Sequence, residues 1–149
     1  MPIYQGAKYH ITGLIELYNN NFIKAIEAFS LATKLEPENS SHWSVLGAIH
    51  MKIGNSFDAL KAFETILFHY PNNIIALINS YDILTYLGDL NAKLPSDLEF
   101  INHEKEKKSI DLNNIWYEQA KKRLNKAISL EPTNYQVIKR QKQLIQSSL

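Results

Sequence analysis

The sequence repeats itself with a 34-residue period, and this feature constrains the fold more than any other. Residues of similar type recur at that spacing as Tyr9 and Trp43, Gly13 and Gly47, Ala25 and Ala59, Phe29 and Phe63, and Pro37 and Pro71. Five pairs of similar residues at the same period and in the same order are unlikely to arise by chance. A period of this length is typical of chains built from stacked supersecondary units.

Physical reasons can be given for the recurring residues. Gly13 and Gly47 fall inside predicted helices, where Gly costs about 1 kcal/mol relative to Ala. We therefore expect a second helix to approach these positions too closely for a side chain. Phe29 and Phe63 are expected to fill the space between one repeat and the next. A proline after the second helix of each unit ends that helix, because it lacks the N–H group and clashes with the preceding turn.

The order aromatic, Gly, Ala, Phe and Pro resembles the tetratricopeptide repeat. The second unit is the better copy, with Trp43, Leu46-Gly47, Gly54, Ala59, Phe63 and Pro71. The first unit departs from the pattern, with Thr12 in place of Leu and Asn20 in place of the mid-repeat Gly. The resemblance implies a right-handed α-solenoid of helix-turn-helix repeats.

A third repeat is present but interrupted. Its first helix is predicted from about residue 73 to 87 and is expected to end at Gly88-Asp89, and Tyr81 replaces the small residue of the other two repeats. In its second helix, the marker Ala120 follows Ala59 of the second repeat at a spacing of 61 rather than 34. We expect this second helix to begin near Asp111, and a short helix over 96–102 within the insertion.

The sequence thus predicts an all-α fold in one domain, with seven main helices and no sheet. The boundaries are repeats at about 6–39, 40–73 and 74–134, an insertion at about 91–111, and a polar capping helix at about 135–147. Such a cap covers the last apolar face of a solenoid.

Residues for chemistry are few. Without cysteine the chain can form neither disulfides nor thiolate metal sites. The histidines are His10, His42, His50, His69 and His103, and no two have the spacing of a metal-binding motif. Glu36, Glu38 and Glu131 flank the turn prolines and are interpreted as solvated caps. We therefore expect no enzyme activity, no cofactor and no metal.

The charge of the chain argues against nucleic acid and anionic membranes as partners. A formal net charge of +1 implies no bulk attraction to nucleic acid or to an anionic membrane. Residues 1–90 hold five Lys and eight acids (net −3), and residues 91–149 hold eleven Lys plus Arg and seven acids (net +4). The basic residues include Lys121, Lys122, Arg123, Lys126, Lys139, Arg140 and Lys142, interpreted as a solvated face or a surface for an acidic partner. The N-terminus is not that of a secretory signal and no apolar stretch is long enough to span a membrane, so a cytoplasmic location is expected.

By resemblance, the first helix of each repeat lines a concave groove. The groove residues implied are His10, Leu14 and Tyr18 from the first repeat, Ser44, Ala48, Met51 and Lys52 from the second, and Ile75, Ile78, Asp82 and Tyr86 from the third. This mixed, mostly apolar surface suits an extended or helical apolar segment of another protein. We predict that Tyr18, Met51, Ile78 and Tyr86 form exposed anchors.

The resemblance also allows subfamilies to be compared. Chaperone-binding tetratricopeptide domains hold acidic C-terminal tails with a clamp of Lys, Asn, Asn, Lys and Arg. The matching places here are His10, Leu14, Val45, Ile75 and Asn79, so the clamp is absent and an acidic tail is not expected. Bacterial type III secretion chaperones that cradle apolar translocator segments are similar in size. A structural subunit of a larger assembly, or self-association through the interrupted repeat, remains an alternative.

Overall fold

The structure is a computed structural model that describes residues 5–93, 95 and 114–148. Within these residues it contains seven α-helices and no strand, which confirms the predicted all-α class. The helix expected over 96–102 lies outside the described residues. The chain divides into two compact units, Met1–Pro71 and Asn72–Leu149, and the single predicted domain stays a prediction. None of the described helices is long and apolar enough to cross a membrane, and the cytoplasmic location also stays a prediction.

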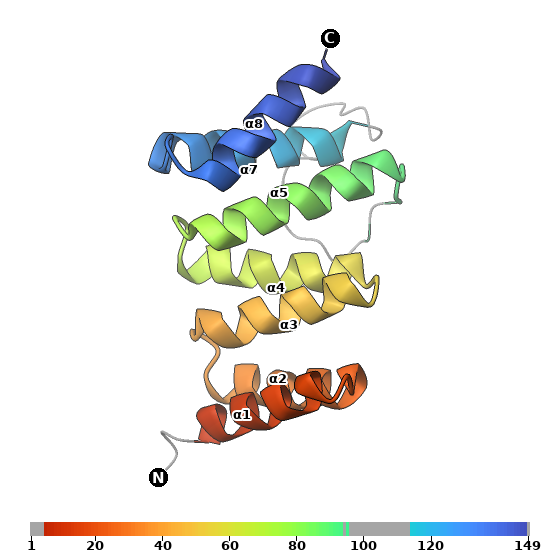
Figure 1. Cartoon of the computed structure of the whole chain (residues 1–149), viewed down its shortest axis with the longest axis vertical. Coiled ribbons are helices and arrows are strands. Elements are labelled where there is room, and N and C mark those ends of the chain that lie inside the picture. Colours follow the sequence, from red (N-terminus) through yellow and green to blue (C-terminus); the bar gives the residue numbers. More distant parts are fainter. Residues whose placement is uncertain (1–4, 94, 96–113, 149) are drawn as a thin grey trace. The chain divides into compact units, whose positions relative to one another are not determined.

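The first unit consists of two helix pairs, each pair being one repeat. Its helices are α1 (Gln5–Tyr18), α2 (Phe22–Leu35), α3 (Ser40–Lys52) and α4 (Ser56–His69) (Figure 1). The turn within each pair contains one residue in the left-handed region, Asn20 with φ 59° and Gly54 with φ 84°. Asparagine and glycine tolerate this conformation better than other residues, so the mid-repeat position of each unit suits a tight turn.

The two repeated glycines are sites of close helix contact, as predicted. A Cβ atom on Gly13 would lie 2.6 Å from the ring of Phe29, and one on Gly47 would lie 2.8 Å from the ring of Phe63. Real Cβ atoms do not come this close to other heavy atoms. Each glycine lowers the helix propensity of its helix. Because glycine has no side chain, however, the phenylalanine of the second helix can lie directly against the first helix.

Phe29 also joins the first repeat to the second, as predicted. Phe29 and Ala25 form a buried core cluster with Leu46 and Ile49 of α3. Partly buried hydrophobic residues pack around this cluster, namely Leu17, Phe22, Ile26, Trp43 and Val45. The interface between α2 and α3 is thus built from the small and aromatic residues that mark the repeat.

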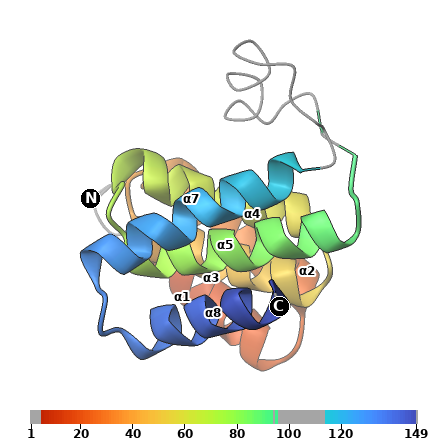
Figure 2. The same cartoon turned by 90° about the horizontal axis from the view of Figure 1, so that it is seen from above.

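The second unit contains the interrupted repeat and the cap. Its helices are α5 (Ile74–Asp89), α7 (Ile115–Leu130) and α8 (Tyr135–Ser147), and Figure 2 shows α5 and α7 alongside each other. The cap has the predicted bounds. α7 begins at Ile115 rather than near Asp111, and Asn114 precedes it as the N-cap residue.

The third helix pair packs closely at a different glycine from the one that the repeat predicts. Tyr81 stands at the expected position and is itself buried, at 8% exposed. α5 ends at Asp89, within the predicted Gly88-Asp89 pair, and a Cβ atom on Gly88 would lie 2.8 Å from the ring of Tyr117 in α7. Positions 81 and 88 are two turns of helix apart and share a face, so the point of close approach has moved along α5.

Both ends of the insertion are held by hydrogen bonds. The Trp116 indole Nε1 donates to the carbonyl of Ala92 at 2.8 Å. The Tyr117 hydroxyl donates to Asp89 Oδ1 at 2.7 Å, and this bond raises the pKa of Tyr117. These contacts join residues 24 and 28 positions apart in the sequence, so α5 and α7 pair across the insertion.

Candidate functional site

The predicted groove residues of the first unit lie on the exposed sides of α1 and α3. Tyr18 is 88% exposed, and Leu14 and Met51 are also exposed. Ala48 is exposed and Ser44 is half-buried. These side chains are free to meet a partner.

Two other predicted groove residues of the first unit are engaged within the protein. The Lys52 ammonium lies 5.5 Å from the ring centroid of Phe22, over a residue of α2. Such a cation–π contact is worth about 0.5–1 kcal/mol at an exposed site. His10 is half-buried and belongs to a hydrogen-bonded cluster described below.

The predicted groove residues of the second unit divide in the same way. Ile75 and Tyr86 are exposed at 61% and 52%. Ile78 is only 8% exposed, so the prediction that it forms an exposed anchor is wrong. The reason is that Ile78 lies on the same side of α5 as Leu77 and Tyr81, which face the protein interior.

Asp82 forms an ion pair with the capping helix. Arg140 of α8 donates from Nε and Nη2 to the two carboxylate oxygens of Asp82, at 2.7 and 2.5 Å. This bidentate geometry is the strong form of an arginine–carboxylate contact. Asp82 therefore fixes α8 to α5, and Arg140 is engaged in this pair instead of belonging to a freely solvated basic face.

The first unit contains a cluster of three titratable groups that the sequence pattern did not predict. His10 Nδ1 lies 2.8 Å from His42 Nδ1, and His42 Nε2 lies 2.9 Å from Glu36 Oε2. The Asn39 side-chain amide donates to the same Glu36 oxygen at 2.9 Å. Glu36 is the C-cap residue of α2, but its carboxylate is engaged by His42 and Asn39 as well as by solvent. His42 is 3% exposed, and the cluster links α1 to α3.

Part of this cluster has a signal in the sequence. The spacing Glu-Pro-x-Asn occurs at 36–39 and again at 131–134. In both copies the Asn amide donates to the Glu carboxylate while the Asn oxygen accepts backbone N–H groups of the next helix. The motif thus marks a helix N-cap whose Asn side chain is held in place by a hydrogen bond to a Glu carboxylate. The position of His42 beside Glu36 follows only from the fold.

The carboxylate determines which ring nitrogens carry protons in the neutral histidine pair. Glu36 can only accept, so His42 donates from Nε2, and its Nδ1 then accepts from His10 Nδ1–H. Both nitrogens of His42 are used in this way, and neither is free for a substrate. Among the described residues no group of three or more acidic or histidine side chains could hold a metal ion.

The cluster predicts a dependence of stability on pH. Burial lowers the pKa of His10, and the nearby His42 lowers it further, while Glu36 opposes the shift. The folded state thus holds fewer protons than the unfolded state just below the ordinary pKa of 6.5. The contribution of neutral His10 to the stability of the folded state is complete above that pH and is lost as the pH falls. The pKa of Glu36 is lowered by the hydrogen bonds from Asn39 and His42, so its contribution is lost only at more acidic pH.

We expect the thermal midpoint to fall between pH 7.5 and pH 5.5, because His10 binds a proton more readily in the unfolded state than in the folded state. The variant His10→Gln should show a smaller fall, measured by circular dichroism at matched ionic strength. His69→Gln, which changes a histidine outside the cluster, should behave like the parent. An equal fall in the parent and in His10→Gln would contradict the role of His10.

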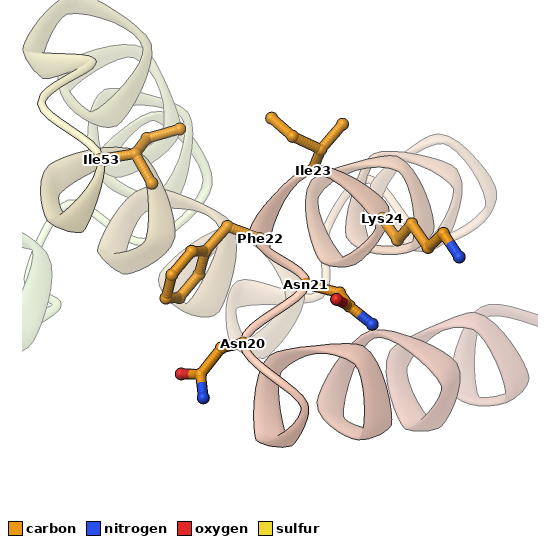
Figure 3. Close-up of a pocket in the computed structure, with 6 residues that line it drawn as sticks. All are labelled: Asn20, Asn21, Phe22, Ile23, Lys24 and Ile53. Carbon is orange, nitrogen blue, oxygen red and sulfur yellow. The ribbon is translucent and has the colours of Figure 1, made fainter.

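A separate pocket lies at the turn end of the first unit. It has a volume of about 440 Å³ and is lined by Asn20, Asn21, Phe22, Ile23, Lys24 and Ile53 (Figure 3). Figure 3 shows that these residues come from the α1–α2 turn, the first turn of α2 and the end of α3. None of the predicted groove residues lines this pocket.

Comparisons with known proteins support the repeat. No family model matches the chain. Superkiller protein 3 of Schizosaccharomyces pombe is 41% identical over 52 residues, which are 35% of this chain and 4% of that protein. The chain therefore spans only a small part of the curated relative that it matches.

Solved structures match over nearly the whole chain. The tetratricopeptide domain of Arabidopsis OM64 has a TM-score of 0.68 at 14% identity and covers 99% of both chains. The first such domain of Spaghetti (RPAP3), bound to the HSP90 peptide SRMEEVD, has a TM-score of 0.68 at 11% identity and covers 96% of this chain and 92% of that one. The second domain of human RPAP3, in complex with an HSP70 peptide, has a TM-score of 0.67 at 17% identity and covers 93% of each chain. Together with the 34-residue period and the glycine–aromatic helix contacts, these matches show that the chain has the tetratricopeptide-repeat fold.

Proposed function

We propose that this protein is a non-catalytic interaction module that binds an apolar or amphipathic segment of another protein along the first helices of its first two repeats. The observation that carries the proposal is the set of exposed apolar side chains on α1 and α3 of the first unit. This set comprises Leu14, Tyr18 and Met51. Aromatic and methionine side chains are typical anchors of such interfaces.

The binding of peptides by domains of the same fold adds support. The RPAP3 domains were solved with HSP90 and HSP70 peptides. The chemistry of their acidic tails is not matched here, because His10, Leu14, Val45, Ile75 and Asn79 stand at the clamp positions. In addition, the Asn79 amide donates to the Ile75 carbonyl of its own helix. We therefore propose an apolar ligand rather than an acidic tail, acting by shape and apolar contact without a cofactor.

The test compares two labelled peptides by fluorescence anisotropy. One is the acidic peptide SRMEEVD, and the other is an uncharged amphipathic helix with leucine and phenylalanine on one face. We expect the second to bind at least tenfold more tightly, a difference of about 1.4 kcal/mol in binding free energy. Tighter binding of the acidic peptide would contradict the proposal.

Variants locate the binding surface. Tyr18→Glu combined with Met51→Glu should abolish binding of the amphipathic peptide, because charge enters the proposed apolar surface of α1 and α3. Both positions are exposed, so folding should change by no more than about 0.5 kcal/mol each. The matched control is Lys121→Gln combined with Lys126→Gln on exposed positions of α7. If the lysine variant loses binding and the groove variant keeps it, the assembly-subunit alternative takes the place of the groove.

A further inference from the structure

The outer face of α1 carries two exposed isoleucines that the groove hypothesis does not use. Ile11 is 58% exposed and Ile15 is 56% exposed. They are four residues apart and therefore lie one above the other on the helix surface. The Thr12 hydroxyl between them donates to the Lys8 carbonyl of the same helix at 3.0 Å, so this hydroxyl needs no partner outside the helix.

The repeat itself shows what such a face packs against. In the 34-residue register, Ile11 corresponds to Val45 and Ile15 corresponds to Ile49. Ile49 is buried in the core cluster and Val45 packs against it. In that cluster α3 lies on Ala25 and Phe29 of α2. The exposed face of α1 is thus the equivalent of the face by which α3 packs on the second helix of the preceding repeat.

We propose that Ile11 and Ile15 dock an amphipathic helix of a partner protein that carries a small residue and an aromatic residue four positions apart. The occupant would repeat on α1 the kind of packing that joins α3 to α2. Apolar burial drives such packing, and a small residue allows the helices to approach closely. This inference does not depend on the proposed groove.

A second copy of the chain is not the occupant that the structure favours. The marker pairs of α2 and α4 are covered, because Ala25 and Phe29 are 0% exposed, and Ala59 and Phe63 are 0% and 1% exposed. A copy could offer these residues only by opening its own core. A helix of a partner protein therefore fits this face better than α2 or α4 of a second copy.

The chain supplies its own probe for this interface. A synthetic peptide of residues 21–36 reproduces α2 with both marker residues. Because an isolated helix of this length is marginal in water, a hydrocarbon staple should join the positions of Glu27 and Leu31, which are exposed in α2. We expect saturable binding to the intact protein, with amide chemical-shift changes centred on α1.

The matched variants are glutamate substitutions at exposed isoleucines of the same unit. Ile11→Glu with Ile15→Glu should weaken peptide binding about tenfold or more, since the buried area of two isoleucines is lost. Ile23→Glu is the control, because Ile23 is 67% exposed and lines the pocket of Figure 3. A peptide with Ser in place of its Phe should bind weakly to every variant. Thermal midpoints verify that all variants fold.

Several results would overturn the proposal. These are no saturable binding, equal binding by the double variant, and loss of binding in Ile23→Glu alone, which would place the peptide in the pocket. Loss of binding in Tyr18→Glu with Met51→Glu but not in Ile11→Glu with Ile15→Glu would place it in the groove. Concentration-dependent dimerisation abolished by Ile11→Glu with Ile15→Glu would make a second copy the occupant.

Discussion

Replacing Phe63 by alanine should lower the free energy of unfolding by about 3–5 kcal/mol, the usual cost of truncating a buried phenylalanine. Phe63 is 1% exposed, and its ring lies against Gly47, where no side chain can move in to fill the space. The loss is a large part of the roughly 5–15 kcal/mol that stabilises a typical domain. Urea denaturation followed by circular dichroism measures it.

The same helix offers a matched control. Phe68 is also in α4 but is 81% exposed. Phe68→Ala should therefore change the free energy of unfolding by no more than about 0.5 kcal/mol. If both alanine variants unfold at the same urea concentration as the parent, Phe63 is not a core residue and the 34-residue register is wrong.

Replacing Gly13 by alanine should destabilise the protein although alanine is the better helix former. Helix propensity alone would add about 1 kcal/mol of stability. The new Cβ atom, however, would lie 2.6 Å from the buried ring of Phe29, and overpacking of a core typically costs about 1–3 kcal/mol. We expect a net loss, because Phe29 is 0% exposed and its ring has no room to move.

A double-mutant cycle identifies the cause of that loss. Phe29→Leu destabilises the parent, but it also removes the ring atoms that the new methyl group meets. Gly13→Ala should therefore cost less in the Phe29→Leu background than in the parent. Strictly additive effects of the two substitutions would show that Gly13 is required for some reason other than the Phe29 ring.

The 34-residue period and the family resemblance of its recurring residues were enough to predict the fold class, the first two helix pairs and the packing of Gly13, Gly47 and Phe29. The reason is that a stack of similar units places the same residue type in the same environment each time. Gly13 and Gly47 each lie against a phenylalanine of the partner helix, and the turn at Gly54 has a positive φ. The role of Pro after the second helix of each unit was likewise predictable without the structure.

Tertiary packing decided the features that have no counterpart in the first two repeats. With Tyr81 in place of the small residue, the close contact of α5 and α7 moved to Gly88, near the end of α5. The Arg140–Asp82 pair depends on how α8 lies against α5, and the burial of Ile78 depends on what packs on that side of α5. His10 and His42 are 32 residues apart and meet only because neighbouring helices bring them together. Helical periodicity assigns a residue to one side of its own helix, but whether that side meets solvent or another helix depends on the rest of the chain.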